Sequence, residues 1–218
     1  MAEDPNLPNQ YAAEHADFVA LARELTDEQW AAPSLCEQWT VRDVVIHAAW
    51  HVHRDRSQIP MFLLHTLTSG PTKAAAKAAA SEAARHEAQS PEKLLEWLAS
   101  SGTCNRVNLA ELMIHQQDVR RPLGLPRKIP GDRLSLILDY CLSLAGSATV
   151  VPGSHKRSKG LRFVATDMDW SAGQGPEVNG AAEAILMVIN GRSSAIGDLA
   201  GPGVKTLAER VTTKRPSS

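Results

Sequence analysis

The stretch VNLAELMIHQQDVRRPLG, residues Val107 to Gly124, decides how the fold is built. On a helix, steps of three and four residues place side chains on the same face. Four polar residues fall on one such stripe: Asn108, Glu111, His115 and Asp118. Glu111 and His115 are an i, i+4 pair that can give one oxygen and one nitrogen to a divalent cation. The stretch therefore predicts a helix that carries part of a metal site.

One helix cannot complete such a site, so a further ligand has to come from elsewhere in the chain. The comparable upstream stretch is WTVRDVVIHAAWHVH, Trp39 to His53, which carries His47 and His51. Thr40 and Asp43 form a capping pair at its start, and its valines and alanines cluster on one side, which predicts a largely buried helix. Either histidine can supply the missing ligand from the edge of that apolar face.

The same polar stripe also has a simpler interpretation. Glu111, His115 and Asp118 can face solvent, where an i, i+4 pair contributes only about 0.2–0.5 kcal/mol. A histidine at the edge of an apolar face is often an ordinary core or surface residue. Spacing alone does not decide between a metal site and a solvent-exposed helix face.

Charge and hydropathy restrict the class of protein. The 218 residues include 23 basic and 24 acidic side chains, for a net charge of −1, which offers no electrostatic attraction for nucleic acid or an anionic membrane. No apolar run approaches the ~20 residues of a membrane span, and the N-terminus lacks a signal-peptide pattern. We therefore expect a soluble, cytoplasmic protein without a nucleic-acid or membrane partner.

The three cysteines, Cys36, Cys104 and Cys141, are widely spaced and form no CxxC motif. This pattern fits reduced thiols, and we predict that each is a small buried apolar side chain. None has the local pattern of an activated nucleophile, and the sequence contains no GxSxG motif. Any chemistry would depend on a metal or on a nucleophile supplied by a cofactor.

The chain divides into a helical part and a mixed part. Periodicity predicts four long helices in residues 1–151, over 11–25, 39–53, 107–124 and 132–150, with a further helix starting at Ser90. The strongly apolar fourth helix is expected to fill the remaining side of a bundle. In residues 152–218 a strand over 161–166, continuing at 168–170, and helices over 180–190 and 201–211 predict a small α/β domain.

Three segments together resemble the mycothiol-dependent maleylpyruvate isomerase family of actinobacteria: residues 25–50, 111–124 and 169–192. The most specific pieces are PSLCEQWTVRDVVIH and ELMIHQQDVRRPLG. The resemblance implies a DinB-like four-helix bundle, so that the predicted fold is mainly α, with this bundle followed by a small α/β C-terminal domain. It also implies metal ligands on the second and third helices. Carried over by motif, these are His47, Glu111 and His115, which favours His47 over His51.

The resemblance further implies a reaction. Three protein ligands leave an open metal position for water or for the thiolate of mycothiol, with zinc expected and nickel, iron or manganese as alternatives. The thiolate would isomerise a small electrophilic substrate by adding to a double bond and leaving, or would remain attached as an S-transferase product.

Five further residues are candidates for roles around this metal. Asp118 is predicted to orient His115 or a bound water. Arg120, together with Arg121, is a candidate for holding substrate carboxylates, although arginine at a helix C-terminus equally fits the helix dipole. Arg162 and Arg192 are candidates for a carboxylate or sugar contact with the cofactor.

Two other classes of protein stay open. One is a non-catalytic metal- or ligand-binding bundle with a structural or regulatory role, which a fourth protein ligand such as His51 would favour. The other is a metal-dependent hydrolase in which bound water is the nucleophile. A bundle of this kind also allows a homodimer, which no feature of the sequence determines.

Overall fold

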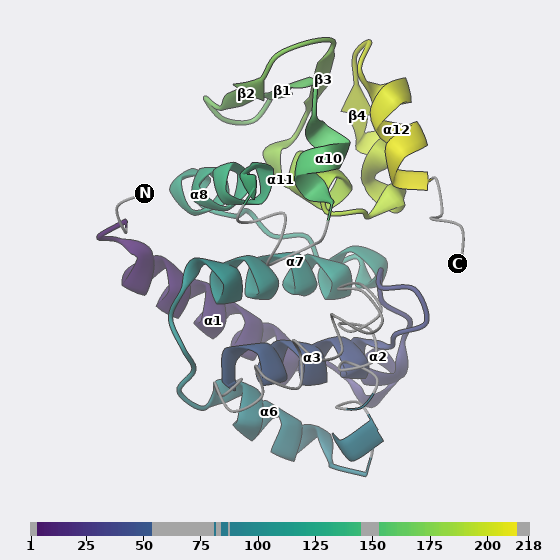
Figure 1. The fold of residues 1–218 in the computed structure, drawn as a ribbon. Coiled ribbons are helices and arrows are strands. Elements are labelled where there is room, and N and C mark those ends of the chain that lie inside the picture. The colour runs from purple at the N-terminus through teal and green to yellow at the C-terminus, as the bar shows by residue number, and fades with distance from the viewer. Residues whose placement is uncertain (1–3, 54–80, 82–83, 87, 145–152, 213–218) are drawn as a thin grey trace, which may run out of the picture. The chain divides into compact units, whose positions relative to one another are not determined.

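The computed structural model describes residues 4–53, 81, 84–86, 88–144 and 153–212. The chain divides into two compact units, Met1–Pro126 and Arg127–Ser218. The first is helical, and the second contains a small sheet with its own helices (Figure 1). The predicted fold, mainly α with a small α/β part at the C-terminus, is confirmed.

The first unit is a helical bundle. Among the residues of this unit that the structure describes, the four principal helices are α1 Leu7–Glu24, α3 Val41–His53, α6 Pro91–Ala99 and α7 Arg106–Leu123. Helices α1 and α3 each pack against both α6 and α7, and the short α2, Asp27–Ala31, packs on α3. Large apolar side chains that are fully buried, including Phe18, Ile46, Leu94 and Leu112, fill the space between these helices. The core of this unit therefore lies between these four helices.

Local interactions determine where α3 and α7 begin and end. The backbone N–H and hydroxyl of Thr40 donate to the carboxylate of Asp43 at 2.8 and 2.7 Å, so the predicted capping pair forms at the start of α3. At the start of α7 the Asn105 side chain accepts from the Asn108 N–H at 2.8 Å. Helix α7 ends at Gly124, whose φ of 66° is the left-handed conformation that glycine adopts without strain.

The second unit contains helices on a four-stranded sheet of order β2-β1-β3-β4. Strand β1 is parallel to β3, whereas β2 pairs with β1, and β4 with β3, in antiparallel fashion. The elements are α8 Gly131–Leu142, α10 Ser154–Ser158, β1 Arg162–Ala165, β2 Ser171–Gly173, β3 Glu177–Gly180, α11 Ala182–Ile189, the 3-10 helix η2 Ser193–Asp198, β4 Leu199–Ala200 and α12 Val204–Thr212. The almost wholly buried α11 is the centre of this unit's core.

The structure differs from the expected role of α8 and from the expected division of the chain. Helix α8 packs against α10 and α11 of the second unit, and α6 provides the fourth principal helix of the bundle. The division falls after Pro126 and not after residue 151, which itself lies outside the described residues. An apolar helix face shows that a helix needs a partner, but periodicity does not identify that partner.

The predicted strands are only partly correct. The expected strand over 161–166 is present as β1, but residues 168–170 form no strand and β2 begins at Ser171. Strand β3 was not predicted, since four residues carry too little alternation to be recognised. Among the residues that the structure describes, no helix is both long and apolar enough to cross a membrane.

Candidate metal centre

Three histidines surround one carboxylate oxygen between α3 and α7. Glu111 Oε2 lies 3.0 Å from His115 Nε2, 3.5 Å from His47 Nε2 and 3.8 Å from His51 Nε2. His47 and His51 come from α3, one turn apart, whereas Glu111 and His115 come from α7. The packing of these two helices thus joins the two stretches that the sequence singled out.

The polar stripe of α7 is inside the protein. Glu111, His115 and Asp118 are 5, 7 and 0 % exposed, and every residue from Asn108 to Val119 is buried. A solvated helix face would leave these side chains accessible, so that interpretation is wrong. A buried carboxylate is costly unless it is paired or bound to a cation.

The donor atoms fit a divalent cation. Ligand atoms of His47, Glu111 and His115 all lie within 4.8 Å of one another. A cation with bonds of about 2.0–2.2 Å to nitrogen and oxygen can contact all three after small side-chain adjustments. Two imidazoles and one carboxylate are also a ligand set of catalytic zinc sites, which keep a further position open.

The surroundings change the pKa values of the paired groups in opposite directions. Burial would raise the pKa of Glu111, but the nearby imidazoles, with His51 first among them, hold that pKa well below its ordinary value. Burial would lower the pKa of His115, but hydrogen bonds with Asp118, Cys36 and Glu111 hold it well above its ordinary value. Without a metal, the site therefore stabilises a carboxylate beside an imidazolium.

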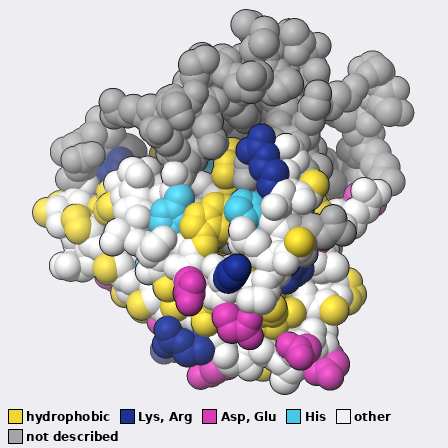
Figure 2. All heavy atoms as spheres, turned by 90° about the horizontal axis from the view of Figure 1, so that it is seen from below, with side chains coloured by type: hydrophobic (Ala, Val, Ile, Leu, Met, Phe, Trp, Pro, Cys, Tyr) yellow, Lys and Arg dark blue, Asp and Glu magenta, His cyan; other side chains and the backbone are white. Residues whose placement is uncertain are grey.

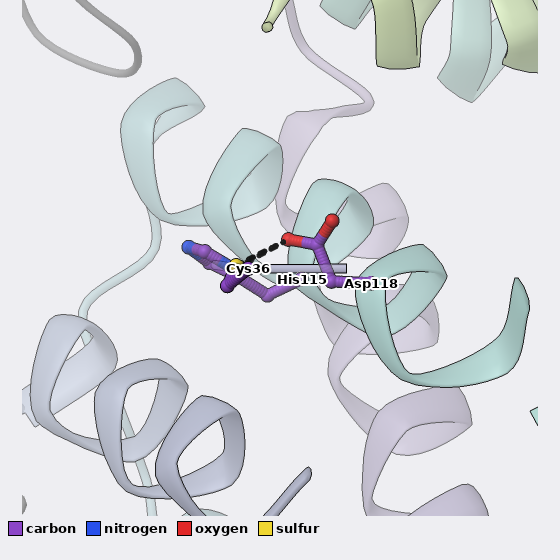
Figure 3. A group of neighbouring side chains, drawn as sticks. All are labelled: Cys36, His115 and Asp118. Atoms are coloured by element: carbon purple, nitrogen blue, oxygen red, sulfur yellow. Dashed lines mark hydrogen bonds and ion pairs between the residues drawn. The ribbon is translucent and has the colours of Figure 1, made fainter. Parts of the chain in front are cut away.

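Asp118 contacts the other nitrogen of the His115 ring. His115 Nδ1 donates to Asp118 Oδ2 at 2.9 Å. The orienting role of Asp118 stays a prediction. The thiol of Cys36 donates to the same oxygen at 3.1 Å. Figure 3 marks this hydrogen bond with a dashed line. Cys36, His115 and Asp118 thus form a second group of potential ligands that shares His115 with the first.

Cys36 is the residue of this site that the sequence did not reveal. The prediction of three buried apolar cysteines holds for Cys141 only, because Cys36 is half-buried and Cys104 is exposed. No local motif around Cys36 indicates its contact with Asp118. Only its position inside the family-specific PSLCEQW piece could have drawn attention to it.

Aromatic rings enclose the histidines. The ring centroid of Trp39 lies 4.9 Å from that of His47 and 6.4 Å from that of His115. Trp50 stands edge-on to His51, with centroids 5.0 Å apart. These indoles pack against the imidazoles and restrict their orientation.

The candidate arginines lie in different surroundings. Arg120 Nε donates to Gln116 Oε1 at 2.8 Å and its Nη1 to the Leu125 carbonyl at 3.3 Å, contacts that fit stabilisation of the end of α7. In the second unit, Arg162 pairs with Glu177 at 3.4 Å and Arg192 donates to the Asn190 carbonyl at 2.8 Å. Substrate or cofactor binding by these arginines stays a prediction.

Two further histidines belong to a different cluster. His86 and His53 stack on Trp97, with ring centroids 4.3 and 6.1 Å away, and His53 Nε2 bonds to the Trp97 carbonyl at 2.8 Å. Figure 2 shows histidine side chains beside an apolar patch on one face of the molecule. His53 and His86 have these partners of their own and serve as controls for the site histidines.

Fold and site together define a helical-bundle protein with a buried histidine–carboxylate centre suited to a divalent cation. Residues 11–112 match the family model of the mycothiol maleylpyruvate isomerase N-terminal domain, a match that includes His47 and Glu111 and ends before His115. This match covers slightly less than half of the chain and, over these residues, confirms the resemblance seen in the sequence. Comparisons with curated proteins and with solved structures gave no significant match.

Proposed function

We propose that this protein is a divalent-metal-binding, mycothiol-dependent enzyme that catalyses cis–trans isomerisation of, or S-transfer to, a small electrophilic substrate. The observation that carries this proposal is the convergence of His47, Glu111 and His115 inside the bundle. Its place in this family supports the choice of mycothiol as the thiol.

Each residue of the centre has a distinct part in the proposed site. His47, Glu111 and His115 hold the cation, which when bound keeps a thiol deprotonated near neutral pH. Asp118 accepts the Nδ1 proton of His115, so that the Nε2 lone pair is directed at the ligand group. The buried position of Glu111 and the indole of Trp39 limit the access of water to the donor atoms. Zinc is the proposed metal, since the donor set is one that it prefers.

A second candidate function is a non-catalytic site closed by a fourth protein ligand. The position of His51 favours it, because His51 Nε2 lies 3.8 Å from the Glu111 oxygen, only slightly farther than His47 Nε2. The two functions differ in the need for His51. If the protein is the proposed enzyme, the His51→Ala variant should keep its metal and still bind the thiol. If the site is closed by four protein ligands, His51→Ala should lower the affinity for the metal.

The ligand assignment is tested by alanine substitution. We expect each of three variants, His47→Ala, Glu111→Ala and His115→Ala, to lower the affinity for zinc by more than about a hundredfold. Loss of a residue that only hydrogen-bonds to a metal ligand already lowers metal affinity by about 10–100-fold. Elemental analysis of protein purified without a histidine tag, followed by calorimetric titration, measures this. His53→Ala and His86→Ala should retain wild-type metal content. Equal metal content in all five variants would contradict the assignment. Loss of metal in His47→Ala and in His51→Ala, with no loss in Glu111→Ala or His115→Ala, would place the site on α3 alone.

The use of a thiol is tested on the zinc-loaded protein. Titration with mycothiol should show saturable binding that disappears in the metal-free protein and in the Glu111→Ala variant. A screen of unsaturated and alkylating electrophiles then separates isomerisation from S-transfer. Zinc binding without thiol binding would favour hydrolysis or a structural site and would contradict the proposed enzyme.

A further inference from the structure

The loop between α2 and α3 is held closed by its own hydrogen bonds. Pro33 and Thr40 form an isolated β-bridge, and the Ser34 N–H donates to the Trp39 carbonyl at 2.9 Å. The Ser34 hydroxyl accepts from the Cys36 N–H at 3.1 Å, and the Trp39 N–H donates to the Cys36 carbonyl at 3.0 Å. The position of Cys36 is thus determined by a structured turn.

This loop is also attached to α7 at the residue beside the metal centre. The Leu35 N–H donates to the Asp118 carbonyl at 3.0 Å, and the Cys36 thiol donates to Asp118 Oδ2 at 3.1 Å. Backbone and side chain of Asp118 are therefore both bound by neighbouring residues of one loop. Trp39, from the same loop, lies against the rings of His47 and His115.

Asp118 needs the donors that surround it. Its side chain is 0 % exposed, and a buried carboxylate without hydrogen bonds would be strongly destabilising. Oδ2 accepts from both His115 Nδ1 and Cys36 Sγ, and Figure 3 shows the three side chains gathered around this oxygen. The thiol and the imidazole N–H are thus both donors to one oxygen of this buried carboxylate.

We propose that Cys36 is a positioning residue of the metal centre. Its thiol holds Asp118, Asp118 holds Nδ1 of His115, and the rigid imidazole then directs Nε2 at Glu111 and His47. Outer hydrogen-bond partners of this kind orient ligating histidines and fix which ring nitrogen carries the proton. This inference rests on the proposed function and adds a residue whose shorter contact is with Asp118 and not with a proposed ligand.

The geometry favours this role over direct coordination by the thiol. Cys36 Sγ lies 3.8 Å from His115 Nδ1, the nitrogen opposite the one that faces Glu111. The 2.9 and 3.1 Å contacts to Asp118 are hydrogen-bond distances. The thiol is therefore on the far side of the His115 ring from the proposed ligand group.

Cobalt(II) binding to the full chain tests the proposal. We expect Cys36→Ala to lower cobalt affinity about tenfold and to alter the visible d–d spectrum at saturation, because His115 loses its fixed orientation. Cys36→Ser keeps an O–H donor and should restore most of the affinity and the wild-type spectrum. Cys104→Ser, at an exposed cysteine, is the matched control and should bind cobalt as the wild type does.

The outcomes separate this inference from the proposed function. Wild-type affinity and spectrum in Cys36→Ala, with the wild type binding cobalt, would overturn the positioning role alone. A thiolate-to-cobalt charge-transfer band that disappears in Cys36→Ala would also overturn it, because the thiol would then be a ligand. Failure of the wild type itself to bind cobalt would overturn the metal centre and this inference together.

Discussion

Tyr11, on α1, has a hydroxyl that is buried and finds no hydrogen-bond partner among the described residues. The side chain is 6 % exposed and its ring stacks on His15, with centroids 5.9 Å apart. Burial raises the pKa of Tyr11 to about 12 from an ordinary 10.0, and the neighbouring Cys104 adds to the rise. The hydroxyl is thus a cost to the folded state, whereas the ring contributes to the core.

We predict that Tyr11→Phe does not lower the free energy of unfolding at pH 7 and raises it by up to about 1 kcal/mol, since it removes an unpaired buried hydroxyl. Because the pKa is higher in the folded protein, the unfolded chain loses its proton first as the pH rises. Between pH 10 and about 12 the wild type should lose stability more steeply than the variant. Urea unfolding over this pH range measures both effects. A loss of more than about 1 kcal/mol at pH 7 would indicate a hydrogen bond that Tyr11 Oη does make.

At the scale of elements, α7 is the helix whose ends matter most, because it carries two of the three proposed ligands. Its last turn closes on Gly124, where the Leu125 N–H donates to the Arg120 carbonyl at 3.0 Å. Gly124 has a φ of 66°, and a Cβ added there would meet no atom within 4 Å. A substitution at this position therefore changes backbone strain without a steric clash.

Gly124→Ala should lower the free energy of unfolding by about 1 kcal/mol, because an L-residue is disfavoured in the left-handed conformation. Gly124→Asn should cost less, since asparagine adopts this conformation more readily. Gly197→Ala is the matched control: its surroundings are equally open and its φ is not in the left-handed region. Chemical denaturation of the three variants makes the comparison. A neutral Gly124→Ala would mean that the end of α7 adopts another conformation in solution.

At the scale of the whole molecule, the candidate centre belongs to one unit. His47, His51, Glu111, His115 and the Cys36–Asp118 pair all lie within Met1–Pro126. The second unit has its own buried core around α11 and the sheet. Binding of a metal is therefore expected to stabilise the first unit directly.

We predict that zinc slows amide hydrogen exchange in α3 and α7 relative to chelator-treated protein and leaves the peptides of α8 to α12 unchanged. At a free zinc concentration about 100 times the Kd, binding adds about 2.7 kcal/mol to the stability of the species that holds the metal. Hydrogen exchange followed by mass spectrometry locates this protection. Equal protection across the second unit would show that both units unfold together, and no protection in α3 would contradict its part in the site.

The sequence by itself determined the local features of this protein. The i, i+4 spacing of Glu111 and His115, the Thr40–Asp43 cap and the glycine after Leu123 act over three or four residues, so their structural meaning can be derived from periodicity. The motifs around His47 and Glu111 were also sufficient to predict the family, which the family match confirms.

Only the tertiary structure decided the features that depend on distant residues. Whether the polar stripe of α7 faces solvent or α3 depends on helix packing, as does the closer approach of His47 than His51 to Glu111. The contact between Cys36 and Asp118 joins residues 82 positions apart, and the apolar face of α8 has its partners in the second unit. Periodicity shows which side of a helix is apolar or polar, but the chain's path in space decides what that side meets.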